Sequence, residues 1–84
     1  MEITSVKLRA LYSGSDRLRA LVSVTFDNEL AVHDIKVIAG KERLFVSMPS
    51  READGRHLDI VHPINQAFRD KLEKAVLRAY HLHD

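Results

Sequence analysis

The first third of the chain alternates hydrophobic and polar residues with a period of two, which is typical of β-strands. One such run covers residues 3–11, and a second covers residues 17–26. Residues 13–16 between them are Ser, Gly, Ser and Asp, which favour a turn. This pattern predicts a β-hairpin with one apolar face.

A third run, over residues 29–39, breaks the alternation partway along. Val32 falls on one parity and Ile35 on the other, so a regular strand would not place both on the same face. Either a β-bulge near His33 and Asp34 switches the face, or the strand is covered on both faces. Under either explanation, this run forms the third strand.

The middle of the chain contains shorter hydrophobic runs that are separated by turn residues. Residues 44–48 predict a fourth strand, which ends where Pro49 removes a backbone N–H. Residues 50–57 are polar and contain an Asp-Gly turn dipeptide at 54–55, so we expect a long loop there. Residues 59–61 predict a short fifth strand.

The last part of the chain repeats hydrophobic residues every three or four positions, which predicts an amphipathic helix over residues 64–82. Asn65 is a suitable N-cap. The expected apolar stripe consists of Ile64, Phe68, Leu72, Ala75, Val76 and Ala79. The pattern therefore predicts one α+β domain over residues 1–84, with an antiparallel sheet of four to five strands over roughly residues 2–61, followed by one C-terminal amphipathic helix.

Composition limits the functions that such a domain can have. The 84 residues include no Cys, which excludes disulfides, thiolate zinc sites and cysteine nucleophiles. The formal net charge is only +1, so total charge does not by itself indicate a nucleic-acid partner. The hydrophobic runs are too short to cross a membrane, and the first residues do not resemble a signal peptide. We therefore expect a soluble, cytoplasmic protein without membrane contact.

The placement of the basic residues is more informative than their number. A central turn in the first hairpin would place Arg9 opposite Arg19, and would put Lys7, Arg9, Arg17 and Arg19 on the face away from the core. Like charges across a strand ladder are destabilising, so such a face favours phosphate binding. The alternative is an ordinary solvated face with acidic neighbours.

A second basic group lies on the predicted helix. Lys71, Lys74 and Arg78 fall within about 60° of one another, so one edge of the helix is basic. A basic edge can follow a phosphate backbone without reading bases. The alternative is that these side chains are only solvated, with Arg78 placed favourably at the negative end of the helix dipole.

The sequence contains no pattern that indicates catalysis or a metal site. The five His residues form neither an HExxH motif nor a tight cluster. His33 and Asp34 are adjacent on a predicted strand, so their side chains point to opposite faces and do not form a dyad. P-loop, GxGxxG and GxSxG motifs are also missing. We expect no enzyme activity, no cofactor and no small-molecule substrate.

Three segments carry a resemblance to a known family. They are VHDIKVI (residues 32–38), LFVSMPS (44–50) and DIVHPIN (59–65), and they resemble the signature segments of the stage V sporulation protein G (SpoVG) family. The opening ITSVKLR (3–9) and the closing AVLRAYH (75–81) are similar to the two ends of that family. The resemblance covers essentially the whole chain, in order and at similar spacing.

The resemblance implies a cytoplasmic bacterial regulator that affects sporulation, septation or related gene-expression programmes. It also implies binding to DNA, and to RNA as well, by a homodimer that pairs sheet strands between subunits, with the third strand as the candidate contact. In many relatives the loop after Met-Pro-Ser opens with two basic residues. Here Arg51 is followed by Glu52, whose charge would repel phosphate. The expected nucleic-acid-binding residues are Arg51, Arg56, Lys71, Lys74 and Arg78.

A second function stays open at this point. The chain would instead be a protein-interaction module of the division or sporulation machinery, for which nucleic-acid binding is incidental. The near-neutral net charge favours this alternative.

Overall fold

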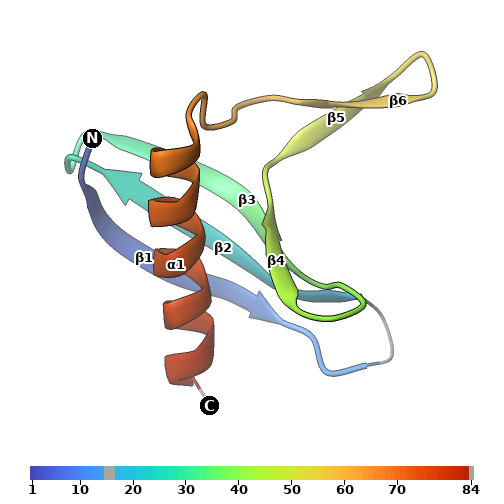
Figure 1. Cartoon of the computed structure of the whole chain (residues 1–84), viewed down its shortest axis with the longest axis horizontal. Coiled ribbons are helices and arrows are strands. Elements are labelled where there is room, and N and C mark those ends of the chain that lie inside the picture. Colours follow the sequence, from blue (N-terminus) through green and yellow to red (C-terminus); the bar gives the residue numbers. More distant parts are fainter. Residues whose placement is uncertain (15–16, 84) are drawn as a thin grey trace.

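The computed structural model describes residues 1–14 and 17–83, which form six strands and one helix (Figure 1). The elements in chain order are β1 (Ile3–Leu11), β2 (Leu18–Phe26), β3 (Leu30–Ala39), β4 (Leu44–Ser47), β5 (Ser50–Ala53), β6 (Arg56–Asp59) and α1 (Gln66–His83). Strands β1 to β4 form one antiparallel sheet in the order β1-β2-β3-β4, and β5 pairs only with β6. The predicted α+β class, with an antiparallel sheet and one C-terminal helix, is confirmed.

The hydrophobic core lies between one face of the four-stranded sheet and α1, which crosses that face (Figure 1). Its buried residues are Ala20, Val22, Val24, Phe26, Ile35, Val37, Val46, Met48, Leu72 and Val76. The alternation of hydrophobic and polar residues in β2 therefore predicted its buried face correctly. Because the opposite face of the sheet carries no helix, the core is a two-layer arrangement.

A bulge in β3 explains why its hydrophobic pattern changes parity. Val32 pairs with Val24 and Ile35 pairs with Val22, so two β3 residues stand opposite the single residue Ser23. One of the two, Asp34, has a φ of 63°, in the left-handed region. Because of the extra residue, Val32 before the bulge and Ile35 after it both face the core. This confirms the explanation that a β-bulge near His33 and Asp34 switches the face of the strand.

A second bulge, in β1, changes the register of the first hairpin. Leu8 pairs with Val22 and Ala10 with Leu21, so Arg9 is the extra residue in β1. The predicted pairing of Arg9 with Arg19 is therefore wrong, and beyond the bulge Leu11 pairs with Ala20. The predicted turn over residues 13–16 includes Ser15 and Asp16, which lie outside the described residues.

Helix α1 begins with the predicted cap. The side-chain oxygen of Asn65 accepts a hydrogen bond of 2.7 Å from the backbone N–H of Phe68. The Phe68 ring then packs against Phe26, with ring centroids 5.8 Å apart. The predicted place of Ile64 in the apolar stripe is wrong, because Ile64 precedes the cap and is 88 % exposed. Within the described part of the chain, the helix does not have the length and hydropathy needed to cross a membrane.

The predicted loop over residues 50–57 is instead part of a β-hairpin, formed by β5 and β6, which we call the arm (residues 50–59). Its turn is the Asp-Gly pair at 54–55, where both residues have positive φ angles of 51° and 75°. The predicted strand at 59–61 is wrong, since β6 ends at Asp59. Figure 1 shows the arm extending away from the sheet and helix, and every residue of β6 is exposed.

Candidate nucleic-acid interface

The five predicted phosphate-binding residues form two groups that the structure does not bring together. Arg51 and Arg56 lie on the arm, whereas Lys71, Lys74 and Arg78 lie along α1. The arm extends away from the C-terminal half of the helix (Figure 1). A single copy of the chain therefore presents two basic surfaces rather than one.

The arm places its two arginines on the same face. Arg51 pairs with Leu58 and Ala53 pairs with Arg56, and residues at i and i+2 on a strand share a face. Both arginines are exposed, and no carboxylate lies within ion-pair distance of either among the described residues. The partly exposed Leu58 lies on the same face. This face, which we call the arginine face, thus combines two guanidinium groups without ion pairs with the apolar side chains of Ala53 and Leu58.

The two acidic residues in the strands of the arm belong to its other face, and the third, Asp54, lies in the turn. Glu52 pairs with His57, and Ser50 pairs with Asp59, on the parity opposite to that of the arginines. Basic and acidic residues that alternate in the sequence, such as Arg51 and Glu52, therefore lie on opposite faces of the hairpin. The expected repulsion between Glu52 and a bound phosphate is reduced, because that carboxylate points away from the arginine face.

The three predicted basic residues of the helix, Lys71, Lys74 and Arg78, differ from one another in their contacts. The ammonium group of Lys71 donates a hydrogen bond of 3.1 Å to the carbonyl oxygen of Met1 and lies 3.5 Å from a carboxylate oxygen of Glu2. Lys74 and Arg78 are exposed and have no carboxylate within ion-pair distance among the described residues. Of the three predicted helical cations, Lys74 and Arg78 are therefore the ones that a phosphate can reach without displacing a partner recorded among the described residues.

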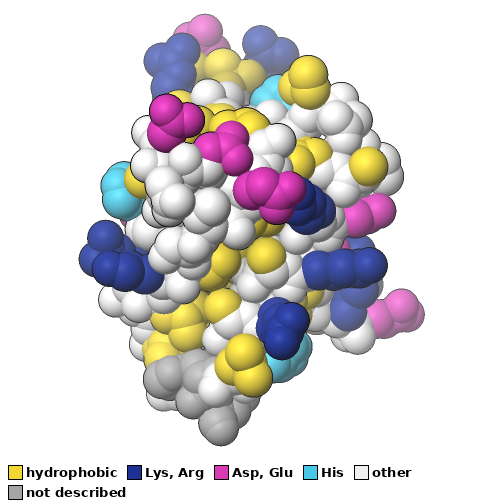
Figure 2. Space-filling view, turned by 90° about the vertical axis from the view of Figure 1, so that its left-hand side faces the viewer, with side chains coloured by type: hydrophobic (Ala, Val, Ile, Leu, Met, Phe, Trp, Pro, Cys, Tyr) yellow, Lys and Arg dark blue, Asp and Glu magenta, His cyan; other side chains and the backbone are white. Residues whose placement is uncertain are grey.

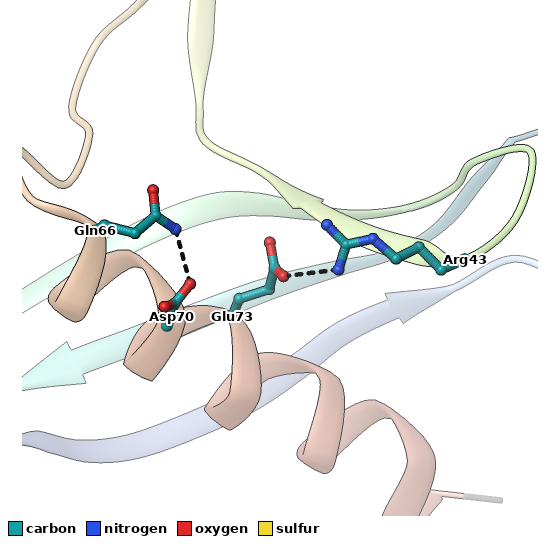
Figure 3. Close-up of polar contacts among 4 residues, drawn as sticks. All are labelled: Arg43, Gln66, Asp70 and Glu73. Atoms are coloured by element: carbon teal, nitrogen blue, oxygen red, sulfur yellow. Dashed lines mark hydrogen bonds and ion pairs between the residues drawn. The ribbon is translucent and has the colours of Figure 1, made fainter.

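Two acidic side chains of the helix, Asp70 and Glu73, accept hydrogen bonds from other side chains. In Figure 2 most acidic side chains lie in the upper half of the molecule, whereas Lys and Arg appear in both halves. Glu73 accepts a hydrogen bond of 3.3 Å from Arg43, which precedes β4 (Figure 3). Asp70 accepts one of 2.8 Å from the side-chain amide of Gln66. The charge of Glu73 is thus partly offset by Arg43, whereas Asp70, one helical turn before Lys74, keeps its negative charge at the N-terminal end of the basic edge.

Two of the four cations expected on the open face of the sheet have structural roles. Arg17 donates a hydrogen bond of 3.1 Å to the carbonyl oxygen of Ala39, and Arg19 donates one of 3.0 Å to that of Gly14. Both bonds satisfy backbone groups at the ends of strands. The expectation that Arg17 and Arg19 join a shared basic face is not supported by these contacts.

The other two cations of that set do share a face. Lys7 pairs with Ser23 on the side of the sheet opposite to α1. Arg9 reaches the same position, because its Nε donates a hydrogen bond of 3.2 Å to the hydroxyl oxygen of Ser23. That hydroxyl also lies 2.8 Å from Nδ1 of His33. The alternating pattern placed Lys7 and Arg9 correctly but gave no sign of this hydrogen-bonded group.

An exposed apolar surface at the base of the arm was not predicted. We call it the arm-base patch, and it consists of Leu30, Leu58, Ile60, Val61 and Ile64, which are between 36 % and 88 % exposed. Beside it lies a mainly apolar cavity of about 400 Å³ between the base of the arm, β3 and the start of α1. The sequence signal for this surface was the hydrophobic residues Ile60, Val61 and Ile64, which were expected to belong to a strand and to the apolar stripe of a helix.

The described residues contain no group of three or more His, Asp or Glu side chains able to hold a metal ion.

Comparisons with known proteins give the family of the chain. The family model named SpoVG matches residues 1–82. A protein of Clostridium acetobutylicum named "Putative septation protein SpoVG" is 53 % identical over 81 residues, covering 95 % of this chain and 84 % of that protein. Proteins of the same name from Caldanaerobacter subterraneus subsp. tengcongensis and Lachnoclostridium phytofermentans are 54 % and 51 % identical, over 95 % and 98 % of this chain and 88 % of each relative. The chain therefore belongs to the SpoVG family.

Proposed function

We propose that this protein is a cytoplasmic bacterial regulator, not an enzyme, that binds DNA and also RNA as a homodimer. In this proposal the regulated process is septation, sporulation or a related programme, and the name "Putative septation protein SpoVG" of its relatives supports septation. The observation that carries the proposal is the arginine face of the arm, on which Arg51 and Arg56 lie together without an ion pair to any carboxylate of the described residues. Guanidinium groups bind phosphate with two parallel hydrogen bonds, which suits a contact with a nucleic-acid backbone.

The shape of the arm supports duplex DNA as the main ligand. A two-stranded β-ribbon fits the major groove of B-DNA, whereas the major groove of an RNA helix is too narrow for side chains to read. The arm is such a ribbon, and it projects from the body without packing against the four-stranded sheet. RNA would then be bound as single strands, through phosphate contacts. Lys74 and Arg78, one helical turn apart, would add contacts to a neighbouring stretch of backbone.

The homodimer is supported by two surfaces that a single copy leaves open. The arm-base patch is apolar and exposed. Strand β3 pairs with β4 only from Lys36 to Ala39, so the backbone groups of residues 30–35 have no strand partner on that side among the described residues. A second copy that covers both surfaces would bury the patch and continue the sheet. Two arms on one duplex would also raise the effective concentration of each for its site.

Salt dependence of binding tests this proposal. Fluorescence anisotropy would follow a labelled DNA duplex and a single-stranded RNA against the full chain at several salt concentrations. If about four phosphates are contacted, the affinity should fall about 100-fold between roughly 50 and 200 mM salt, because bound counterions are released. No detectable binding at low salt, or an affinity that does not change with salt, would refute the proposal.

The alternative is an interaction module of the division or sporulation machinery, and the arm-base patch is the observation that favours it. Reversing the helical cations in the triple variant Lys71→Glu, Lys74→Glu and Arg78→Glu separates the two functions. A regulator should lose DNA binding while its circular dichroism spectrum is unchanged, whereas an interaction module should keep a partner that binds at the arm-base patch. Lys41→Glu, in the exposed turn between β3 and β4, measures how much the reversal of one charge outside the helix contributes.

A further inference from the structure

A groove between β1 and the C-terminal half of α1 is separate from the arm and from the arm-base patch. It has a volume of about 450 Å³, and its apolar lining includes Ile3, Val6, Ala75, Ala79 and Leu82. In Figure 2 a band of hydrophobic side chains runs down the lower half of the molecule, with Lys and Arg on both sides of it. A groove of this kind can hold an apolar surface that brings negative charge to its rims.

The backbone along this groove is open to pairing. Strand β1 is the first strand of the sheet order and, among residues 1–14 and 17–83, pairs only with β2. Its ladder with β2 is regular from Ser5 to Leu8, between the two register shifts. The other edge of these four residues presents unpaired N–H and C=O groups, to which an extended peptide can add as a further strand.

The two faces of such an added strand would meet different surroundings. Val6 points to the core side, where it pairs with the buried Val24, so neighbouring peptide residues on that side would lie beneath Ala75 and Ala79. Lys7 points to the opposite side, where Arg9 also lies. The peptide therefore needs apolar residues on one parity and acidic residues on the other.

The charges beside the free edge of β1 indicate whether a second copy of the chain or a different protein pairs with it. Strand β1 contains Lys7 and Arg9 but no acidic residue, and Lys71 and Arg78 line the groove. Pairing of β1 with the β1 of a second copy would bring like charges together across the ladder, which is destabilising. A strand with Asp or Glu at the alternate positions would instead form favourable cross-strand pairs.

We propose that the groove between β1 and α1 is a docking site for an extended segment of another protein, in which apolar residues alternate with Asp or Glu. The segment adds to the free edge of β1 and places its apolar side chains against α1. Its acidic side chains lie on the face away from α1, where Lys7 and Arg9 attract them. One consequence rests on the function proposed above: the segment would fill the groove that Lys71 and Arg78 line, and both residues belong to the proposed nucleic-acid surface, so the segment and a nucleic acid would compete for the protein.

The test uses a short synthetic peptide of alternating Val and Glu, blocked at both ends, with the full-length chain. Its control is a peptide of the same composition in which the Val and Glu residues stand in separate blocks. Binding is followed by NMR chemical shifts and by hydrogen exchange of the backbone amides of residues 5–8. The alternating peptide should bind, and should slow exchange at alternate amides in this stretch, while the block peptide should not. Equal binding of both peptides, or shifts that avoid β1, would overturn the proposal.

Backbone pairing is tested by two versions of the alternating peptide, each N-methylated on one of the two sets of alternate amides. Only one set can donate to β1, so one version should lose binding and the other should keep it. Equal affinities of the two versions would contradict strand addition.

The charge requirement is tested by Lys7→Glu, which should weaken peptide binding about fivefold through the loss of one favourable pair and the gain of a repulsion. Lys41→Glu, remote from the groove, should leave the affinity unchanged. If both variants weaken binding equally, attraction is non-specific and the proposal fails. Lys7 is not among the residues proposed to bind nucleic acid, so a loss of peptide binding in Lys7→Glu with DNA binding retained separates this proposal from the proposed function.

Discussion

The body of the molecule and its arm differ in how far their side chains are buried. The body packs four strands and a helix around fully buried residues such as Val22, Ile35 and Val76. The arm consists of two four-residue strands that pair only with each other, and β6 is exposed throughout. An isolated two-stranded hairpin is at best marginally stable in water.

Stability and recognition are therefore located in different parts of this protein. Side chains of the body are chosen for packing, and their loss should lower the free energy of unfolding. Side chains of the arm contribute little to a single copy, so the charge separation between Arg51 and Glu52 is better explained by contact with another molecule. Substitutions in the two regions should therefore change different measured quantities.

The largest expected effect is on the stability of the body. Ile35→Ala should lower the free energy of unfolding by about 2–5 kcal/mol, because it leaves a cavity at a fully buried position. Urea unfolding followed by circular dichroism measures the change. Leu58→Ala, on the exposed arm, is the control and should shift stability by no more than about 0.5 kcal/mol in the monomer. Similar losses in both variants would remove the distinction between body and arm.

The next effect concerns self-association through the arm-base patch. Ile64 is 88 % exposed in a single copy, yet burial of an Ile side chain is worth about 1.5–3 kcal/mol. Ile64→Asp should therefore raise the dimer dissociation constant at least about tenfold, as measured by sedimentation velocity over a concentration series. Ile60→Ser, 65 % exposed in the same patch, should act in the same direction. An unchanged constant in both variants would show that the patch is not the dimer contact.

A smaller effect is expected where the arm's connection meets the helix. Asn65→Ala removes the hydrogen bond from the Asn65 side chain to the N–H of Phe68 and should cost about 1 kcal/mol of stability. Thermal unfolding measures this loss. Asn65→Asp, which can still accept the bond, should retain most of the stability, and an equal loss in both variants would argue against the cap.

The parts of the fold that were predicted are those with a clear hydrophobic period. Strands β1 to β3 and the helix bury one face, so the periods of two and of three to four appear in the sequence. The arm has no buried face, and alternation therefore gives no signal there. Its only local sign is the Asp-Gly pair at 54–55, which fits a loop as well as a hairpin turn.

Register limited what could be predicted about the candidate site. The sequence identifies Arg51 and Arg56 as basic residues near a turn, but only the pairing of β5 with β6 separates them from Glu52. The extra residue at Arg9 likewise follows from a bulge, which does not change the composition of the strand. The sequence pattern thus identifies Arg9, Arg51 and Arg56 as basic residues of interest, but the faces on which they lie are known only from the structure.

The measurement that tests the account most directly is the salt dependence of DNA binding by two arm variants compared with the unaltered chain. Removing both guanidinium groups in the double variant Arg51→Ala and Arg56→Ala should make the slope of log affinity against log salt shallower by about two for each arm that contacts the duplex. Glu52→Ala, which changes the opposite face, should leave the slope unchanged, and the melting temperature of both variants should match that of the parent. A double variant with the parent's slope, or a Glu52 variant with an equally changed slope, would contradict the assignment of nucleic-acid contact to the arginine face.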